Sequence, residues 1–385
     1  MSAMKSPQAF CALAMTCSLF SPAFAAEEPL VRVAILQEVP NARLTILAPC
    51  RATDLEKGTL VKQWPELKWQ QVESGPSGLM IGQTEIHTDV LLLEPTRDAI
   101  IRINARPYRG TLILYRTARG KVTIVNRLGL EEYLVGALAS EVGQGWPMEA
   151  LKAHAIVSRT VVAHRIWIQR GQPFDVSPAT HLYYGAQAER EDASAAVRAT
   201  EGQVLSFNGE LFSASFSTNC GGHTENASEL WDMQGSVIAP LKGRPDPYCR
   251  DMKHYRWEAN VGTKTFMEKL GDFSKQIGEL RDCQVVERNA SGRVRSVLLV
   301  GTDGSVTIPG RTFRERIGSD RLKSLNFTVT VSPAGISFSG FGWGHGVGLC
   351  QWGTYGMAIQ NHTMDEILNF YFPGAKRRPL KGLPG

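Results

Sequence analysis

The sequence lacks long apolar runs, repeats and flexible linkers. Beyond its first residues, no stretch approaches the roughly 18 uncharged apolar residues that a membrane-spanning helix needs. We therefore expect no stable membrane anchor. Internal repeats, low-complexity segments and Ser/Gly-rich linkers are also missing, which argues against a solenoid or a chain of loosely tethered domains.

A strong excess of either charge is missing too. The chain has 42 Lys and Arg against 37 Asp and Glu, for a formal net charge of +5. Removing the predicted leader deletes Lys5 and leaves +4, since 41 − 37 = 4. This modest balance argues against nucleic acid as the main partner, whereas an anionic glycan remains compatible.

Residues 1–25 have the pattern of a secretory signal peptide. Lys5 precedes a short apolar run, and the small residues Ala23 and Ala25 mark a cleavage site before Ala26. The cysteines in this run, Cys11 and Cys17, are not preceded by the small residues of a lipoprotein signal. We therefore expect an exported protein of about 360 residues, found in the periplasm or the cell wall.

Residues 26–125 predict a β-rich N-terminal region. Short apolar runs recur between turn signals, and the last of them, 108–126, is typical of a hairpin. No catalytic constellation is visible there. With no linker behind it, this region is expected to dock on the rest of the chain.

An amphipathic helix is predicted to follow, and it carries an acid on its apolar face. Apolar residues recur at three- and four-residue steps across 130–140, and Glu141 continues that face three residues after Leu138. Glu131 and Glu132 instead fall in the first turn, where the helix dipole and water favour acids. Glu141 is therefore the acid expected to lie against packed surface, which would raise its pKa.

A glycine elbow and a second helix come next. Gly143-Gln-Gly145 breaks the first helix, and Pro147 fits the first turn of a second helix that extends to Ile168. Most sides of this second helix are apolar, so it should cross the core. Lys152 and Arg159 lie seven residues apart on one line; they could point toward the elbow and bind substrate, or form a solvated basic stripe.

The cysteines allow two interpretations. The predicted mature chain has an odd number of them: Cys50, Cys220, Cys249, Cys283 and Cys350. An oxidising compartment favours at least one disulfide, and Cys220 with Cys249 is the preferred pair because both flank one irregular segment. The alternative is a structural zinc site made of Cys220, His223 and Cys249.

Four ordered motifs together resemble the SpoIID/LytB family of bacterial cell-wall proteins. They are EEYLVGALASEVGQGWPMEALKAHAIVSRT, GRTFRERIG, LKSLNF and GWGHGVGLCQWGTYGMA, and the similarity extends over 126–372. The resemblance and the patterns above imply an α+β fold. A helical catalytic core with a glycine elbow, residues 126–385, would pack against antiparallel β-structure and follow the β-rich N-terminal region.

The resemblance implies a peptidoglycan lytic transglycosylase. Such an enzyme cleaves the β-1,4 bond between N-acetylmuramic acid (MurNAc) and N-acetylglucosamine (GlcNAc) with formation of 1,6-anhydroMurNAc, and it requires no cofactor. In this sequence the single general acid and base would be Glu141. The alternative is a non-catalytic, wall-binding enhancer of an N-acetylmuramoyl-L-alanine amidase. The partners would be glycan strands, with or without stem peptides, or such an amidase.

The remaining site residues rest on the same resemblance and on helix spacing. The expected substrate-binding residues are Lys152, Arg159, Tyr183, Thr218, Gly221, Gly222, His345 and Gln351. A zinc amidase built on Cys220, His223 and His345 is disfavoured, because no HExxH or comparable ligand-plus-base motif is present.

Overall fold

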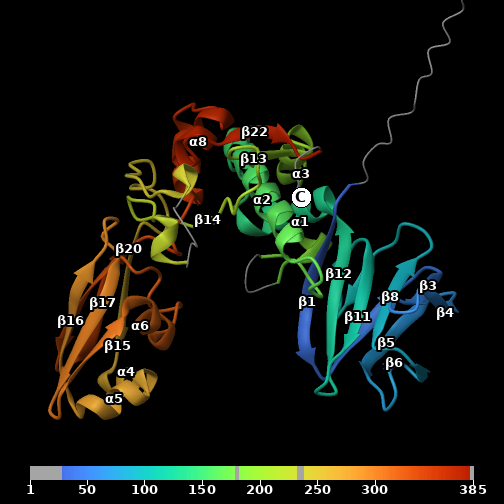
Figure 1. The fold of residues 1–385 in the computed structure, drawn as a ribbon, viewed down its shortest axis with the longest axis horizontal. Coiled ribbons are helices and arrows are strands. Elements are labelled where there is room, and N and C mark those ends of the chain that lie inside the picture. The colour runs from blue at the N-terminus through green and yellow to red at the C-terminus, as the bar shows by residue number, and fades with distance from the viewer. Residues whose placement is uncertain (1–27, 178–181, 232–237, 382–385) are drawn as a thin grey trace, which may run out of the picture.

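The structure is a computed structural model of the 385-residue chain, and it describes residues 28–177, 182–231 and 238–381. The predicted signal peptide lies outside these residues. Figure 1 shows two N-terminal sheets, a central helical region and a lobe of small sheets and short helices. This arrangement confirms the α+β class, with a β-rich N-terminal region ahead of the helices. Within the described residues, no helix is long and apolar enough to cross a membrane.

The N-terminal region consists of two six-stranded antiparallel sheets. The first has the order β1-β12-β11-β8-β3-β4 and the second β10-β9-β2-β5-β6-β7. The strands are β1 (Leu30–Val39), β2 (Asn41–Ile46), β3 (Cys50–Asp54), β4 (Thr59–Trp64), β5 (Leu67–Ser74), β6 (Leu79–Ile81), β7 (Thr84–Ile86), β8 (Val90–Pro95), β9 (Ile101–Ile103), β10 (Arg106–Tyr108), β11 (Thr111–Arg116) and β12 (Val122–Gly129). The predicted hairpin is β11 with β12, paired from Thr111 with Arg127 to Arg116 with Val122.

The N-terminal sheets share one hydrophobic core with the central helices. Strand residues such as Leu44 and Leu112 belong to the same buried cluster as Leu134 and Leu151. The strand β12 leads directly into the helix α1 (Leu130–Glu141), with Gly129 as its N-cap. Burial of a continuous apolar surface therefore joins the two regions, which is the docking expected from the absence of a linker.

The central region is built on α1 and α2 (Met148–Ile168). Nearly every side chain of α2 from 150 to 163 is buried, as expected for a helix that crosses the core. Around it lie α3 (Glu191–Ala199), α7 (Gln351–Ile359), α8 (Met364–Tyr371), the short helices η1 (Gly185–Ala188), η2 (Ala227–Glu229) and η3 (Ala239–Leu241), and the strand pairs β13 (Gln203–Ser206) with β22 (Lys376–Pro379) and β14 (Phe216–Ser217) with β21 (Leu349–Cys350).

Residues 256–341 form a lobe with its own hydrophobic cluster, within the range predicted as a single core. Its sheets have the orders β15-β20-β19 and β16-β17-β18. Its elements are β15 (Arg256–Val261), α4 (Thr263–Leu270), α5 (Asp272–Ile277), β16 (Leu280–Arg288), β17 (Val294–Gly301), β18 (Ser305–Pro309), α6 (Gly310–Ile317), β19 (Phe327–Ser332) and β20 (Gly335–Phe341). The strands β16 to β18 form an antiparallel meander, and the GRTFRERIG motif forms α6.

Candidate functional site

Glu141 is the last residue of α1, and its carboxyl group contacts neutral donors. The backbone N–H of Leu182 donates to Oε1 at 2.9 Å, and the Gln351 amide Nε2 donates to Oε2 at 3.5 Å. Desolvation raises the pKa of Glu141, and these two hydrogen bonds oppose that rise. The side chain lies at packed surface, as the helical pattern predicted.

The elbow after Glu141 is held by α3. Arg190 donates through Nη1 to the carbonyl of Ala139 at 2.7 Å and through Nη2 to that of Gly143 at 3.2 Å. These carbonyls lie at the end of α1, where no intrahelical donor remains for them. Asp192 accepts from the N–H of Gly145 at 3.4 Å. Sequence reasoning missed both residues, because nothing local indicates that the start of α3 meets the end of α1.

A histidine of α2 orients Gln351. The Gln351 Nε2 lies 3.0 Å from His154 Nε2, and the other ring nitrogen lies 3.0 Å from Ser158 Oγ. Because the amide donates, His154 Nε2 accepts and the ring proton lies on Nδ1, facing Ser158. Burial lowers the pKa of His154 to about 4, so the ring is neutral at neutral pH. His154 is thus a buried histidine with both ring nitrogens hydrogen-bonded, and it is linked to Glu141 through Gln351.

Arg159 points neither to the elbow nor to solvent, which corrects both alternatives drawn from helix spacing. Its side chain is fully buried, and it makes a bidentate ion pair with Glu131 at 2.7 and 2.6 Å. Its Nη1 also donates to the carbonyl of Gln203 at 3.1 Å. All of this lies at the opposite end of α1 from Glu141, so the guanidinium secures the start of the helix.

The other acids and cations near α1 also differ from expectation. Glu131 does not face water, since it binds Arg159. Glu132 is half-buried; desolvation raises its pKa, and Arg109 opposes the rise. Lys152 pairs with Glu149 at 2.9 Å on its own helix. The structure thus gives Lys152 a local partner and brings it into no contact with Glu141.

Tyr183 is a packing residue beneath the site. Its ring lies 5.1 Å from that of Tyr133 and 6.1 Å from that of Tyr108, and its hydroxyl donates to Asn126 Oδ1 at 3.0 Å. It therefore supports the segment that brings Leu182 to Glu141.

Thr218, Gly221 and Gly222 belong to the turn that follows β14. The carbonyl of Thr218 accepts from the backbone N–H of Trp352 at 3.1 Å, which ties the turn to α7. Gly221 and Gly222 have φ values of 71° and 95°. A Cβ at Gly221 would lie 2.8 Å from the backbone of Phe341, so this turn requires glycine.

His345 lies apart from Glu141. It lines a cavity of about 210 Å³ together with Trp231, Arg293 and Arg314. Burial, with Arg293 and Arg314 nearby, lowers the pKa of His345 to about 4. Its Nδ1 accepts from the N–H of Val347 at 3.0 Å, a bond that holds the glycine loop.

An aromatic and basic surface extends from the elbow. Trp146 contacts Trp352, with ring centroids 5.2 Å apart, and Lys253 lies over Trp352 at 5.9 Å. Lys323 lies over the ring of Trp343 at 4.4 Å. Trp352 directly follows Gln351, the partner of Glu141, in the first turn of α7.

The cysteines assemble differently from the predicted sets. Cys220 and Cys249 are free thiols with their sulfur atoms 3.5 Å apart. Cys350 and Asp246 join them, and one ligand atom from each of the four lies within 4.8 Å of the others. His223 is outside this group and contacts the carbonyl of Thr224 through Nδ1. Of the residues in the alternative zinc set, Cys220 and Cys249 therefore lie in this cluster and His223 does not, whereas Asp246 and Cys350 were not part of that set.

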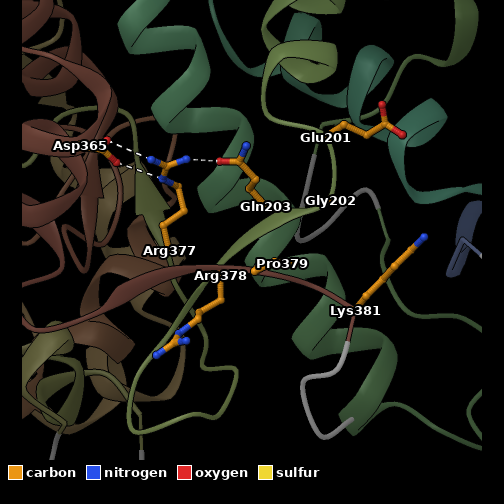
Figure 2. Close-up of a pocket in the computed structure, with 8 residues that line it drawn as sticks. All are labelled: Glu201, Gly202, Gln203, Asp365, Arg377, Arg378, Pro379 and Lys381. Carbon is orange, nitrogen blue, oxygen red and sulfur yellow. Dashed lines mark hydrogen bonds and ion pairs between the residues drawn. The ribbon is translucent and has the colours of Figure 1, made fainter. Parts of the chain in front are cut away.

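A cavity of about 870 Å³ lies at the pair β13 and β22, and none of the predicted site residues lines it. Figure 2 shows Arg377 between Asp365 and Gln203, while Arg378 and Lys381 extend away from them. Because its cations are either paired locally or spread along a strand, we assign this cavity no role in the site.

Comparisons with known proteins match the regions just described. The family model described as Stage II sporulation protein matches residues 118–207, which hold Glu141, and the domain of unknown function DUF8618 matches 238–348. An uncharacterized protein of Brachyspira hyodysenteriae is 30% identical over 300 residues, covering 77% of this chain and 78% of that protein. The chain belongs to the SpoIID/LytB family.

Named relatives agree with this membership. The Stage II sporulation protein D of Bacillus subtilis is 29% identical over 283 residues, covering 68% of this chain and 77% of that protein. The Amidase enhancer of the same organism is 25% identical over 283 residues, covering 63% of this chain and 39% of that protein.

Proposed function

We propose that this SpoIID/LytB protein is a peptidoglycan lytic transglycosylase with Glu141 as its single general acid and base. The observation that carries the proposal is the environment of Glu141: its partners among the described residues are the neutral donors Leu182 and Gln351, and desolvation raises its pKa. A raised pKa makes a carboxyl group hold its proton more readily, and the protonated group can then protonate a leaving oxygen.

The neighbouring acids support a mechanism with one carboxylate. Ordinary glycosidases use two carboxyl groups about 5–10 Å apart. Glu131 is about 15 Å from Glu141 along the helix, given ten residues at about 1.5 Å each, and it is bound to Arg159. Asp192 is closer to the elbow, but it is bound to Arg190. Neither carboxylate is available as a nucleophile or as a base for water.

In the proposed reaction, Glu141 donates its proton to the oxygen that joins MurNAc C1 to GlcNAc O4. The C1–O4 bond breaks, and an oxocarbenium-like state forms at C1. The Glu141 carboxylate then removes the proton of the MurNAc C6 hydroxyl, and O6 bonds to C1 to close the 1,6-anhydro ring. Glu141 regains its proton and no water is consumed. The hydrogen bonds from Leu182 and Gln351 stabilise the carboxylate between the two steps.

The aromatic surface that extends from the elbow suits a glycan that carries carboxylates. The faces of Trp352 and Trp343 offer apolar area to pyranose rings, and Lys253 and Lys323 can bind the lactyl carboxylates of MurNAc. We also propose that residues 1–25 direct export, which would place the protein where such strands are found.

The test is product analysis with purified glycan strands, both denuded and carrying stem peptides. We expect the chain from Ala26 onward to release products that end in 1,6-anhydroMurNAc. Glu141→Gln keeps the shape of the side chain but cannot transfer a proton, so turnover should fall by about 10²- to 10⁴-fold. Glu191→Gln is the matched control, because that acid is exposed at the start of α3 and pairs with Arg198.

The relative named Amidase enhancer favours a second candidate, a non-catalytic enhancer of a cell-wall amidase. In that case the protein would release no anhydro products and would increase the rate of a purified amidase equally with and without Glu141→Gln. Anhydro products formed by Glu141→Gln at the wild-type rate would show that Glu141 is not the acid. Reducing MurNAc ends in place of anhydro ends would show hydrolysis and contradict the proposal.

A further inference from the structure

Four buried ligand groups from three separate segments meet beside α7. Cys220 follows β14, Asp246 and Cys249 lie in the loop before β15, and Cys350 ends β21. All four residues are at most 1% exposed. Residues as distant as 220 and 350 meet because β14 and β21 pair in parallel, Phe216 with Leu349 and Ser217 with Cys350. We propose that Cys220, Asp246, Cys249 and Cys350 bind one Zn²⁺ as a structural site.

The spacing of the ligand atoms fits a single tetrahedral ion. Zinc–sulfur bonds of about 2.3 Å place the sulfurs of a tetrahedral site about 3.8 Å apart, and a carboxylate oxygen comes slightly closer. Here Cys220 Sγ is 3.5 Å from Cys249 Sγ and 3.1 Å from Asp246 Oδ2. Three thiolates with one carboxylate is also a ligand set that zinc accepts.

Asp246 points to a cation. Its side chain is fully buried, yet its partners among the described residues are neutral: the hydroxyl of Tyr371 at 2.9 Å, the N–H of Tyr248 at 2.9 Å and the thiol of Cys220. A buried carboxylate without a cation is costly, and metal coordination is one of the ways in which proteins avoid that cost. A disulfide between two of the cysteines would leave this carboxylate and the third thiol uncompensated.

The surroundings resemble those of coordinated thiolates. The N–H groups of Cys220 and Gly353 donate to Cys350 Sγ at 3.1 and 3.3 Å. Tyr371 orients Asp246 in the way that outer hydrogen bonds orient metal ligands. Gly353 makes this approach possible, because a Cβ there would lie 2.0 Å from the Tyr371 hydroxyl and 2.5 Å from Asp246 Oδ2.

A buried cation offsets part of the charge of the filled site. Zinc with three thiolates and one carboxylate is net negative. Arg293 is buried nearby and donates to the carbonyl of Cys220 at 2.7 Å and to that of His223 at 3.0 Å. Its guanidinium interacts electrostatically with all three cysteines and with Glu225. The polypeptide therefore supplies positive charge beside the ligands.

The site would fix the start of α7. Cys350 is the N-cap of that helix and directly precedes Gln351, which donates to Glu141. Zinc would thus hold the turn after β14, the loop of Asp246 and the first residue of α7 in one arrangement. The ion would be a structural element that keeps Gln351 in place, with the thiol protons of the three cysteines released to solvent on binding.

Metal analysis of the purified chain tests the proposal directly. We expect one zinc per chain by inductively coupled plasma mass spectrometry, and loss of that zinc in Cys249→Ser, Cys350→Ser and Asp246→Ala. The matched controls are Cys50→Ser and Cys283→Ser, which alter buried thiols outside the group, and His223→Ala, which tests the ligand set that sequence alone suggested. All three controls should keep full zinc.

A ligand variant can lose zinc simply because it fails to fold, so a second measurement uses the unaltered chain. Chelation should lower the melting temperature, and Cys220, Cys249 and Cys350 should become alkylated only after chelation. Refilling with Co²⁺ should give thiolate charge-transfer absorption. A disulfide between any two of these cysteines in non-reducing peptide maps, absence of zinc from folded protein, or loss of zinc in His223→Ala would overturn the proposal. None of these readouts depends on glycan cleavage.

Discussion

The glutamates at the two ends of α1 lie in opposite electrostatic environments. At the first turn, Glu131 receives both nitrogens of a buried guanidinium, at 2.7 and 2.6 Å. At the last residue, Glu141 receives one backbone N–H and one amide, both neutral. The same neighbouring helix governs both ends: α2 presents Arg159 to the first acid and, through Gln351, neutral His154 to the second.

This difference shows how the fold sets the electrostatic environment of each acid. A buried guanidinium pairs with Glu131, whereas desolvation without a nearby cation raises the pKa of Glu141. His154 and Arg159 are five positions apart on α2, so one buried helix contributes to both environments. Arg159, a buried cation that would lower the pKa of an acid beside it, therefore lies at the far end of α1 from Glu141.

The largest expected effect on stability comes from removing Arg159, the cation at the first turn of α1. Arg159→Met should lower the free energy of unfolding by about 4 kcal/mol, because a buried ion pair loses one partner and Glu131 stays partly buried. Urea denaturation measures this. Arg198→Met is the control, since its pair with Glu191 is exposed and should change stability by less than about 1 kcal/mol. Equal effects in the two variants would mean that the buried ion pair stabilises the fold no more than the exposed pair does.

At the Glu141 end of α1, lowering the pH should destabilise the fold through protonation of His154. Its pKa of about 4 in the fold lies below the ordinary histidine value of 6.5, so between these values the unfolded chain binds the proton and the folded chain does not. Stability should fall as pH decreases from 6.5 to 4, with a total loss from this group of about 3 kcal/mol. His154→Gln should remove that part of the slope. His345 adds a similar slope, so His154→Gln should reduce the pH dependence and not abolish it.

Loosening the elbow should have a smaller effect. Arg190→Ala removes the donors to the carbonyls of Ala139 and Gly143, which should cost about 1–3 kcal/mol of unfolding free energy. Glycan turnover should fall as well, because the end of α1 carries Glu141. Arg190→Lys keeps the charge but not the fork, so it should recover only part of either property. Full recovery by lysine would show that charge alone holds the elbow.

The smallest effect is on stability in Glu141→Gln. The pKa of Glu141 is raised in the fold above the ordinary glutamate value of 4.5, so ionisation of this group destabilises the folded wild-type chain as pH rises. The variant should therefore be slightly more stable than wild type at neutral pH, and the difference should vanish below about pH 4.5. Glu131→Gln should have the opposite sign, since it leaves Arg159 without its carboxylate. Destabilisation by Glu141→Gln at neutral pH would contradict the proposed neutral environment.

Sequence patterns predicted the elements better than the contacts between them. The apolar steps correctly placed Glu141 on the packed face of α1, and the glycines that follow correctly predicted a break just after it. The apolar pattern also identified α2 as a core helix. The same steps put Arg159 on a line with Lys152, but a helical repeat does not say which neighbour each turn meets. The sequence did not predict the roles of Arg190 and Asp192, because those roles depend on how α3 packs against α1.

The cysteines illustrate the same limit. Sequence proximity favoured Cys220 with Cys249, and these two do meet. Cys350 was missed because it joins them only through the parallel pairing of β14 and β21, a contact across more than a hundred residues. Asp246 was missed because a lone aspartate in a loop normally indicates a turn.

The lobe of residues 256–341 leaves and re-enters the central region through adjacent strands, since Arg256 on β15 pairs with Phe341 on β20. In evolutionary terms, this is the geometry of an inserted module. The parts of such a module far from its junction can gain, lose or exchange residues without changing the fold of the host region. Arg293 sets the limit to that freedom. It comes from the module but donates to the carbonyls of Cys220 and His223 in the host, so excising the module would leave those two carbonyls without their donor.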